Sequence, residues 1–222
     1  MSKLVLGYWD LRGLTEPIRY LLHYADVDFE DKRYTVGPAP EFDTSEWTNE
    51  KNTLGLDFPN LPYIIEGDLK LSQSTAILRY LARKYKLVGE TEEETIRLDL
   101  AEQQLVDVRT GLVKVAYSGS EYEKNREEYL KTLPEKLELL SKFLGDRKFI
   151  LGDKLTYVDF LLYEVLDFHR LFEATSLNAY ENLKSYLERF EALPAIEKYM
   201  KSGKFSRLPV FGPMASFGGK KE

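Results

Sequence analysis

The sequence predicts a small α/β domain over residues 1–88 followed by an all-helical domain over residues 89–222. Two observations support this division. The first part alternates short apolar runs with amphipathic ones, whereas from Thr91 onward every long segment has the apolar spacing of a helix. The length of 222 residues also exceeds the usual size of one compact domain. The turn-like Val88-Gly89-Glu90 lies between the two parts.

The N-terminal part is expected to contain, in order, a strand, a helix, a strand, a helix, a hairpin and a helix. The predicted elements are a strand over 3–8, a helix opened by Thr15-Glu16-Pro17, a strand over 29–36, a helix from about Ser45 to Leu54, hairpin strands over 63–65 and 69–71, and a helix over 74–84. Gly55 ends the second helix. This order describes a domain of the thioredoxin type.

The C-terminal part is expected to contain helices and an irregular tail. The predicted helices are a long one from about Thr91 to Val115, one whose apolar face runs from Leu133 to Leu144 and which ends at Gly145, one from Val158 to about Leu171, and two shorter ones near 182–191 and 195–201. Thr91 with Glu94, and Thr156 with Asp159, have the spacing of capping boxes. The helix after Thr156 is apolar nearly all round, which places it at the centre of the helical domain. The tail over 205–217 is aromatic and rich in Gly and Pro, as expected of a segment packed over a surface.

Charge and hydropathy argue against several classes of function. A formal net charge of -6 and a pI near 5.2 disfavour binding to nucleic acid or to anionic membranes. The N-terminus lacks the apolar stretch of a signal peptide, and no later segment approaches the length of a membrane span. We therefore expect a cytoplasmic protein.

Cysteine is absent from the sequence, which removes disulfides, thiolate metal sites and protein thiol nucleophiles. His23 and His169 are the only histidines, and neither has a neighbouring ligand pattern. We interpret both as structural residues and expect neither a metal site nor a serine triad. Any sulfur chemistry must therefore come from the substrate.

Tyr8 stands in Gly7-Tyr8-Trp9-Asp10, at the end of the first predicted strand. A tyrosine there would present its hydroxyl at the sheet edge beside a helix N-terminus, which is where ligands bind in such sheets. The chain has 15 tyrosines, and the alternative interpretation of Tyr8 is an ordinary packing residue.

Asn60-Leu61-Pro62 precedes the hairpin, and Gln73-Ser74 begins the helix after it. A cis peptide before Pro62 would free the Leu61 backbone to pair with an extended, peptide-like ligand, and the helix amides at Gln73 and Ser74 would attract a carboxylate. A γ-glutamyl tripeptide has both groups. The alternative is a turn proline followed by an ordinary N-cap serine.

Longer motifs resemble the mu class of cytosolic glutathione transferases over nearly the whole chain. They are Leu6-Gly7-Tyr8-Trp9-Asp10-Leu11-Arg12-Gly13-Leu14, Asn49-Glu50-Lys51, Leu54-Gly55-Leu56-Asp57-Phe58-Pro59-Asn60-Leu61-Pro62-Tyr63, the segments 73–84 and 152–160. The resemblance implies an N-terminal thioredoxin-like domain that binds glutathione and a helical domain that covers the electrophile site. It also implies a homodimer that conjugates the glutathione thiolate to electrophilic small molecules, without a metal.

The same resemblance implies a role for individual residues. Tyr8 would hold the glutathione sulfur as a thiolate, and Tyr117 would be a second catalytic hydroxyl, or else only a wall of the pocket. The glutathione-binding residues would be Tyr8, Trp9, Trp47, Lys51, Asn60, Leu61, Gln73, Ser74 and, from the other subunit, Asp107. The electrophile pocket would contain Tyr8, Trp9, Leu14, Arg109, Tyr117 and Phe211. Phe58 would insert between helices of the partner subunit.

The chain departs from the family pattern at Thr44, where relatives commonly have an arginine that helps to hold the glycine carboxylate of glutathione. We therefore expect weaker glutathione binding, although Lys51 and Trp47 could compensate. Three other functions fit the same scaffold: a non-catalytic carrier of apolar ligands, a structural protein of the lens-crystallin kind, and a glutathione-dependent prostaglandin isomerase.

Overall fold

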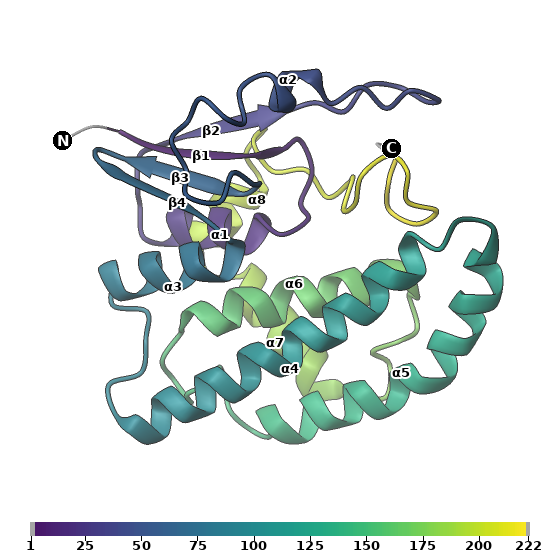
Figure 1. Ribbon diagram of the computed structural model, residues 1–222. Helices are drawn as coiled ribbons and strands as arrows, with labels where there is room; N and C mark the ends of the chain where they lie inside the picture. Colours follow the sequence, from purple (N-terminus) through teal and green to yellow (C-terminus); the bar gives the residue numbers. More distant parts are fainter. Residues whose placement is uncertain (1–2, 221–222) are drawn as a thin grey trace.

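The computed structural model describes residues 3–220 and places a four-stranded sheet above a body of helices (Figure 1). The N-terminal elements are β1 (Leu4–Trp9), α1 (Glu16–Tyr24), β2 (Phe29–Tyr34), α2 (Ser45–Thr48), β3 (Tyr63–Glu66), β4 (Leu69–Ser72) and α3 (Ser74–Lys84). The strand order is β2-β1-β3-β4, with β1 and β2 parallel and the other neighbours antiparallel. The predicted thioredoxin-like order is confirmed.

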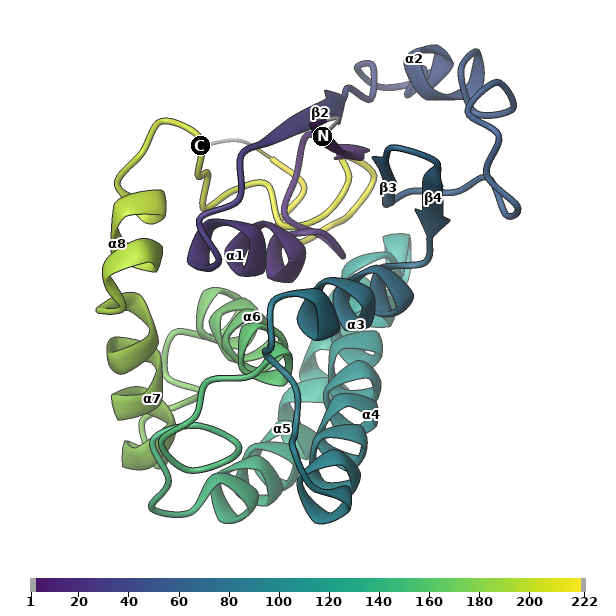
Figure 2. The same cartoon turned by 90° about the vertical axis from the view of Figure 1, so that its left-hand side faces the viewer.

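Helices α1 and α3 lie between the sheet and the helical domain (Figure 2). The face of α1 formed by Ile18, Leu21 and Leu22 is buried in the main core, as its spacing predicts. A smaller aromatic cluster contains Tyr63 and Trp47, whose rings stack with centroids 5.9 Å apart. This cluster attaches the α2 segment to the sheet.

Helix α2 is shorter than predicted, because it ends at Thr48 and the chain continues as turns instead of reaching Leu54. The side chain of Glu50 explains the difference. Its carboxylate accepts hydrogen bonds from Lys32 Nζ at 2.5 Å and from the Tyr34 hydroxyl at 2.7 Å, both on β2. These contacts hold the segment against the edge strand, and local helix propensity does not reveal them.

The helical domain contains α4 (Glu92–Ala116), a 3-10 turn (Gly119–Glu121), α5 (Tyr122–Leu144), α6 (Tyr157–Phe172), α7 (Glu181–Glu191) and α8 (Pro194–Met200). Helix α6 lies at its centre, as predicted, and buries Phe160 and Leu166 completely. The capping box of Thr156 and Asp159 is confirmed. The box predicted at Thr91 is only half formed, because Glu94 accepts from the Glu90 amide instead of reaching back to Thr91.

The C-terminal tail returns to the N-terminal domain and packs beside the turn that follows β1 (Figure 2). The amides of Arg12 and Gly13 donate to the carbonyls of Pro209 and Val210 at 3.1 and 3.0 Å. Within residues 3–220, no helix has the length and apolar character needed to cross a membrane. The link between α3 and α4 spans residues 85–91, and the position 88/89, where the sequence predicts a domain boundary, falls within it.

Candidate active site

Tyr8 lies near the end of β1 with only 6% of its surface exposed. Its hydroxyl oxygen accepts a hydrogen bond from the Leu14 amide at 3.1 Å. Burial raises the pKa of Tyr8 above its ordinary value, against the opposing effects of the Leu14 amide and of Arg109. The hydroxyl is therefore neutral near pH 7, and it donates to no residue that the structure describes.

The turn beside Tyr8 requires a glycine at position 13. Gly13 has a φ of +48°, in the left-handed region, and a Cβ there would lie 2.6 Å from the Tyr8 hydroxyl oxygen. A larger residue would push the Leu14 amide away from Tyr8. The sequence places this glycine in the motif that follows the first strand.

A cavity of about 290 Å³ opens beside the Tyr8 hydroxyl. Its lining residues are Tyr8, Trp9, Leu11, Gly13, Leu14, Val36, Thr44, Arg109, Val113, Tyr117, Phe211, Gly212 and Met214. Every residue expected in the electrophile pocket lies in this wall. We call this space the electrophile cavity.

Tyr117 and Arg109 reach the electrophile cavity from the C-terminal end of α4. The Tyr117 hydroxyl accepts from the Gly212 amide at 2.7 Å, and its ring packs against Phe211 with centroids 5.8 Å apart. Burial raises the pKa of Tyr117 and lowers the pKa of Arg109. Arg109 forms no hydrogen bond or ion pair with the described residues, so its guanidinium is a desolvated cation between two tyrosine hydroxyls and Glu164.

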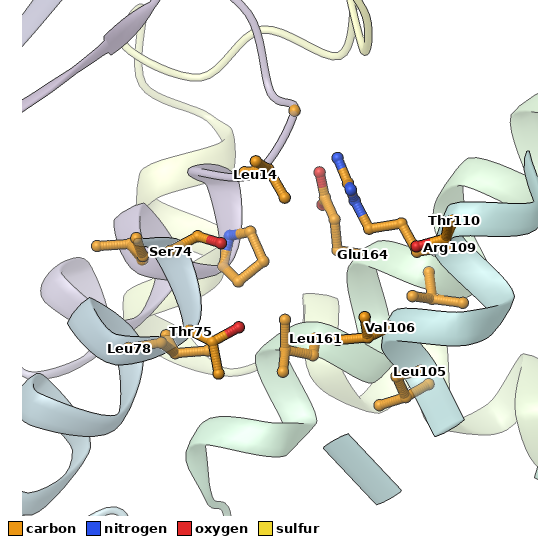
Figure 3. Close-up of a pocket in the computed structure, with 14 residues that line it drawn as sticks. Leu14, Ser74, Thr75, Leu78, Leu105, Val106, Arg109, Thr110, Leu161 and Glu164 are labelled. Carbon is orange, nitrogen blue, oxygen red and sulfur yellow. The ribbon is translucent and has the colours of Figure 1, made fainter. Parts of the chain in front are cut away.

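A second cavity, of about 170 Å³, lies between the two domains and shares Gly13, Leu14 and Arg109 with the first. Figure 3 shows Ser74 and Thr75 of α3 on one side and α4 and α6 on the other. The side chains of Arg109 and Glu164 lie at the same end of this interdomain cavity. Ser74, at the start of α3, is the predicted glutathione residue that lines it.

Tyr8 and Trp9, also expected at glutathione, line the electrophile cavity, whereas the remaining expected residues lie outside both cavities. Trp47 is buried against Tyr63, whereas Lys51 is half-buried and forms no ion pair with a described residue. The peptide before Pro62 is cis, as predicted. The Leu61 amide donates to the Asn60 side chain at 2.9 Å, an interaction that the sequence does not predict.

Two of the residues expected at glutathione, Gln73 and Asp107, have exposed side chains. Gln73 precedes α3 with a φ of 74°, and Asp107 projects from α4 without a hydrogen bond or ion pair to any described residue. Neither lines the electrophile cavity or the interdomain cavity. The expected role of Asp107 in the site of another subunit stays a prediction.

The two histidines lie away from both cavities. His169 is buried in α6, where Nε2 lies 2.8 Å from the Tyr129 hydroxyl and Nδ1 lies 2.6 Å from the Val165 carbonyl. His23 stacks on Tyr199 with ring centroids 4.0 Å apart. Burial lowers the pKa of each to about 4, so both pack as neutral rings. Within residues 3–220, no group of three or more metal-ligating side chains is present.

Phe58 lies in the loop before β3 and exposes 72% of its surface. An apolar groove of about 210 Å³ lies elsewhere on the molecule, mainly between α4 and α5. Its lining residues are Leu100, Ala101, Gln104, Leu105, Leu139, Leu140, Phe143, Ile150 and Leu162. We call it the α4–α5 groove. Leu100 and Leu139 are more than half exposed at its rim.

Comparisons with known proteins agree with this architecture. The model of the glutathione S-transferase N-terminal domain matches residues 4–83, and a model of the C-terminal domain matches residues 106–203. Glutathione S-transferase Mu 1 of Mus musculus is 54% identical over 217 residues, which cover 98% of this chain and 99% of that protein. Mu 1 of Oryctolagus cuniculus is 57% identical over 216 residues, or 97% and 99% of the two chains. The chain belongs to the mu class of the glutathione S-transferase family.

Solved glutathione S-transferases have the same fold. The glutathione S-transferase Blo t 8 matches with a TM-score of 0.89 at 37% identity, over 96% of this chain and 99% of that one. A Pi-class glutathione S-transferase of Onchocerca volvulus matches with a TM-score of 0.85 at 32% identity, over 97% and 100% of the chains. The predicted fold class is thereby confirmed.

Several residues of the electrophile cavity in this glutathione S-transferase are not predicted from the sequence. Val113, Gly212 and Met214 line it beside the expected residues. Val113 has a recognisable signal, because it lies one helical turn before Tyr117 on α4. Gly212 and Met214 follow Phe211 in the irregular tail, where no periodicity indicates which side chains point inward.

Proposed function

We propose that this glutathione S-transferase conjugates glutathione to electrophilic small molecules, and that Tyr8 donates a hydrogen bond to the glutathione sulfur. One observation carries the assignment of Tyr8. Its hydroxyl is buried and neutral, accepts the Leu14 amide at 3.1 Å, and lies in the wall of the electrophile cavity. Because the Tyr8 oxygen already accepts a hydrogen bond from the Leu14 amide, the hydroxyl proton can be donated to a ligand.

The energy required of this hydrogen bond is modest. A free thiol has a pKa of about 8.5, so only about 3% is thiolate at pH 7. Lowering the thiol pKa by about two units requires roughly 2.7 kcal/mol of preferential stabilisation of the anion. A charge-assisted hydrogen bond in a partly dry site supplies energy of this order.

Arg109 and Tyr117 complete the proposed chemistry. The Arg109 guanidinium has no carboxylate bound to it, so its charge favours the thiolate over the neutral thiol. Tyr117 accepts from the Gly212 amide, which leaves its own proton available to stabilise negative charge as it develops on the electrophile. Trp9, Leu14 and Phe211 supply the apolar walls that hold the electrophile.

Glutathione is proposed to extend from the electrophile cavity along the N-terminal domain. Its γ-glutamyl end would lie at Gln73 and Ser74, where α3 begins and its amides favour an anion. The cysteinyl backbone would pair with Leu61, and in doing so would replace the Asn60 side chain as acceptor of the Leu61 amide. The glycine carboxylate would lie near Trp47 and Lys51.

A symmetric homodimer is part of the proposal. The exposed Phe58 ring fits the chemistry of the α4–α5 groove of a second copy, and the two contacts would be related by a two-fold axis. Asp107 would then reach the γ-glutamyl amine in the neighbouring site. We propose that this dimer acts in the cytoplasm, in line with its membership of the mu class. The curated relatives named above favour conjugation over a carrier, crystallin or isomerase role.

Replacing Tyr8 with Phe tests the proposed function. Tyr8→Phe removes the donor without leaving a cavity, so the protein should fold normally. If the bound thiol returns to a pKa near 8.5, kcat with a model aryl halide should fall by about 25-fold at pH 7. Tyr129→Phe removes another buried hydroxyl, outside both cavities, and serves as the matched control. An undiminished kcat in Tyr8→Phe would exclude the proposed role.

A further inference from the structure

The turn over residues 10–14 carries the amide that contacts Tyr8. Leu14 N donates to the Tyr8 oxygen at 3.1 Å, and Gly13 packs so tightly that a Cβ would lie 2.6 Å from the same oxygen. The turn therefore packs directly against the Tyr8 hydroxyl. Whatever fixes the turn also fixes this hydrogen bond.

Arg12 joins this turn to the helical domain. Its side chain is 1% exposed, and its Nε and Nη2 atoms donate to the two carboxylate oxygens of Glu164 at 3.1 and 2.6 Å. Nη1 lies 2.7 Å from Asp167 Oδ2, one turn further along α6.

The backbone of the turn adds the two amide contacts to the tail that were described above. It also bonds within the N-terminal domain, where the Asp10 amide donates to the Tyr34 carbonyl at 2.8 Å and the Leu11 carbonyl accepts from Arg19 Nη1 at 2.8 Å. Arg12 is therefore the side chain through which the turn contacts α6.

Among the described residues, Glu164 has a single ion-pair partner, Arg12. Asp167 also pairs with Arg170 and Arg207, whereas Arg12 is the one described residue that forms a hydrogen bond or ion pair with Glu164. Burial by itself would lower the pKa of Arg12, but the carboxylates, Glu164 foremost, raise it well above its ordinary value. The guanidinium thus remains charged although it is buried.

A buried ion pair such as Arg12–Glu164 is expected to add little to the net stability of the fold. Replacing a buried ion pair with apolar residues of similar volume is often neutral or stabilising, because the desolvation cost offsets the attraction. A bidentate arginine–carboxylate pair does, however, fix the relative position and angle of its two partners. Glu164 lines the interdomain cavity together with Leu14 (Figure 3), so the pair lies directly beside the turn.

We propose that Arg12 and Glu164 are positioning residues of the transferase site, whose buried pair holds the 10–14 turn on α6 and keeps the Leu14 amide directed at the Tyr8 oxygen. The proposal rests on the function proposed for Tyr8. An amide bound to the oxygen polarises the hydroxyl and strengthens the hydrogen bond that it donates. Without the pair, the turn shifts and the bound thiol becomes harder to ionise.

The test replaces both partners, so that no charge is left buried alone. In Arg12→Met/Glu164→Leu, the pKa of bound glutathione, followed by the ultraviolet absorbance of its thiolate against pH, should rise by about one unit. Below that pKa, kcat should fall by about tenfold, while KM for glutathione changes by less than about twofold. A folded double variant with an unchanged thiol pKa overturns the proposal.

Two further variants separate positioning from a general loss of stability. Arg126→Met/Glu173→Leu removes a partly buried arginine–glutamate pair that joins α5 to the end of α6, and it should leave the thiol pKa unchanged. Glu164→Asp keeps the charge but shortens the side chain, and it should raise the thiol pKa by a smaller amount. If the double variant does not fold, an unchanged thiol pKa in Glu164→Asp contradicts the proposal.

Tyr8→Phe in the same titration distinguishes the two proposals. If this substitution leaves the thiol pKa unchanged, the function proposed for Tyr8 is wrong. If Tyr8→Phe raises the thiol pKa but the Arg12 and Glu164 variants do not, only the positioning role is wrong.

Discussion

Thr44 is half-buried, lies in the electrophile cavity and is also expected near the glycine end of glutathione. Its neighbours Asp43 and Glu46 are acidic and already accept hydrogen bonds, from Ser45 and from the Thr35 amide. Lys51 forms no ion pair with a described residue, so under the proposed function it would be the main cation for the glycine carboxylate.

Thr44→Arg should tighten glutathione binding. The new guanidinium supplies a charged donor for the glycine carboxylate, and partial exposure limits the gain to about 1 kcal/mol, or roughly a fivefold lower KM for glutathione. Steady-state kinetics at low and high salt check this, because a screened ion pair loses strength as salt rises. Thr44→Gln has similar length without the charge and is the control. An equal KM in all three proteins would count against the expected weakness at Thr44.

At the scale of elements, local patterns predict most of the fold and long-range contacts limit the rest. The bounds of α3 agree with the prediction from Ser74 to Lys84, because its apolar spacing and its start signal are local. Helix α2 ends early because of Glu50, whose partners lie 16 and 18 residues earlier. The Arg12–Glu164 pair joins residues 152 positions apart, so no sequence window contains it. The position of Tyr8 at the end of the first strand indicates it as a candidate, whereas Arg109 and Tyr117 are named only through the family resemblance.

Helix α6 makes stability depend on pH through His169. Burial lowers the pKa of this histidine from 6.5 to about 4 in the folded protein. Between these pH values the unfolded chain binds a proton that the folded chain does not, so the free energy of unfolding falls as pH falls. The loss reaches about 3 kcal/mol near pH 4, and it is absent above pH 6.5.

Chemical denaturation at a series of pH values, with the protein concentration fixed, measures this dependence. His169→Gln can still bond to Tyr129 and Val165 but does not titrate. The difference in unfolding free energy between the wild type and this variant should therefore shrink steadily from pH 7 to pH 4. Parallel pH profiles would show that His169 does not contribute.

The whole molecule presents apolar surface that a single copy does not cover. Phe58 is 72% exposed on the N-terminal domain, and Leu100 and Leu139 are 61% and 53% exposed on the helical domain. In a two-fold dimer each copy offers the ring to the groove of the other, so one contact type occurs twice. Asp107 is exposed and lines neither the electrophile cavity nor the interdomain cavity, as the proposal that it acts in the site of a second copy requires.

Phe58→Ala should therefore weaken both assembly and glutathione binding. Burying a phenylalanine contributes about 2 kcal/mol, and two copies give about 4 kcal/mol, so the dimer dissociation constant should rise roughly a thousandfold. Sedimentation equilibrium measures it, with Met214→Ala, another exposed apolar side chain outside the α4–α5 groove, as the control. Because Asp107 would come from the partner, KM for glutathione in Phe58→Ala should rise on dilution and recover as the dimer re-forms. If the Phe58→Ala dimer persists on dilution, Phe58 does not contribute to assembly. If the variant is monomeric but its KM for glutathione is normal, Asp107 is not part of the glutathione site.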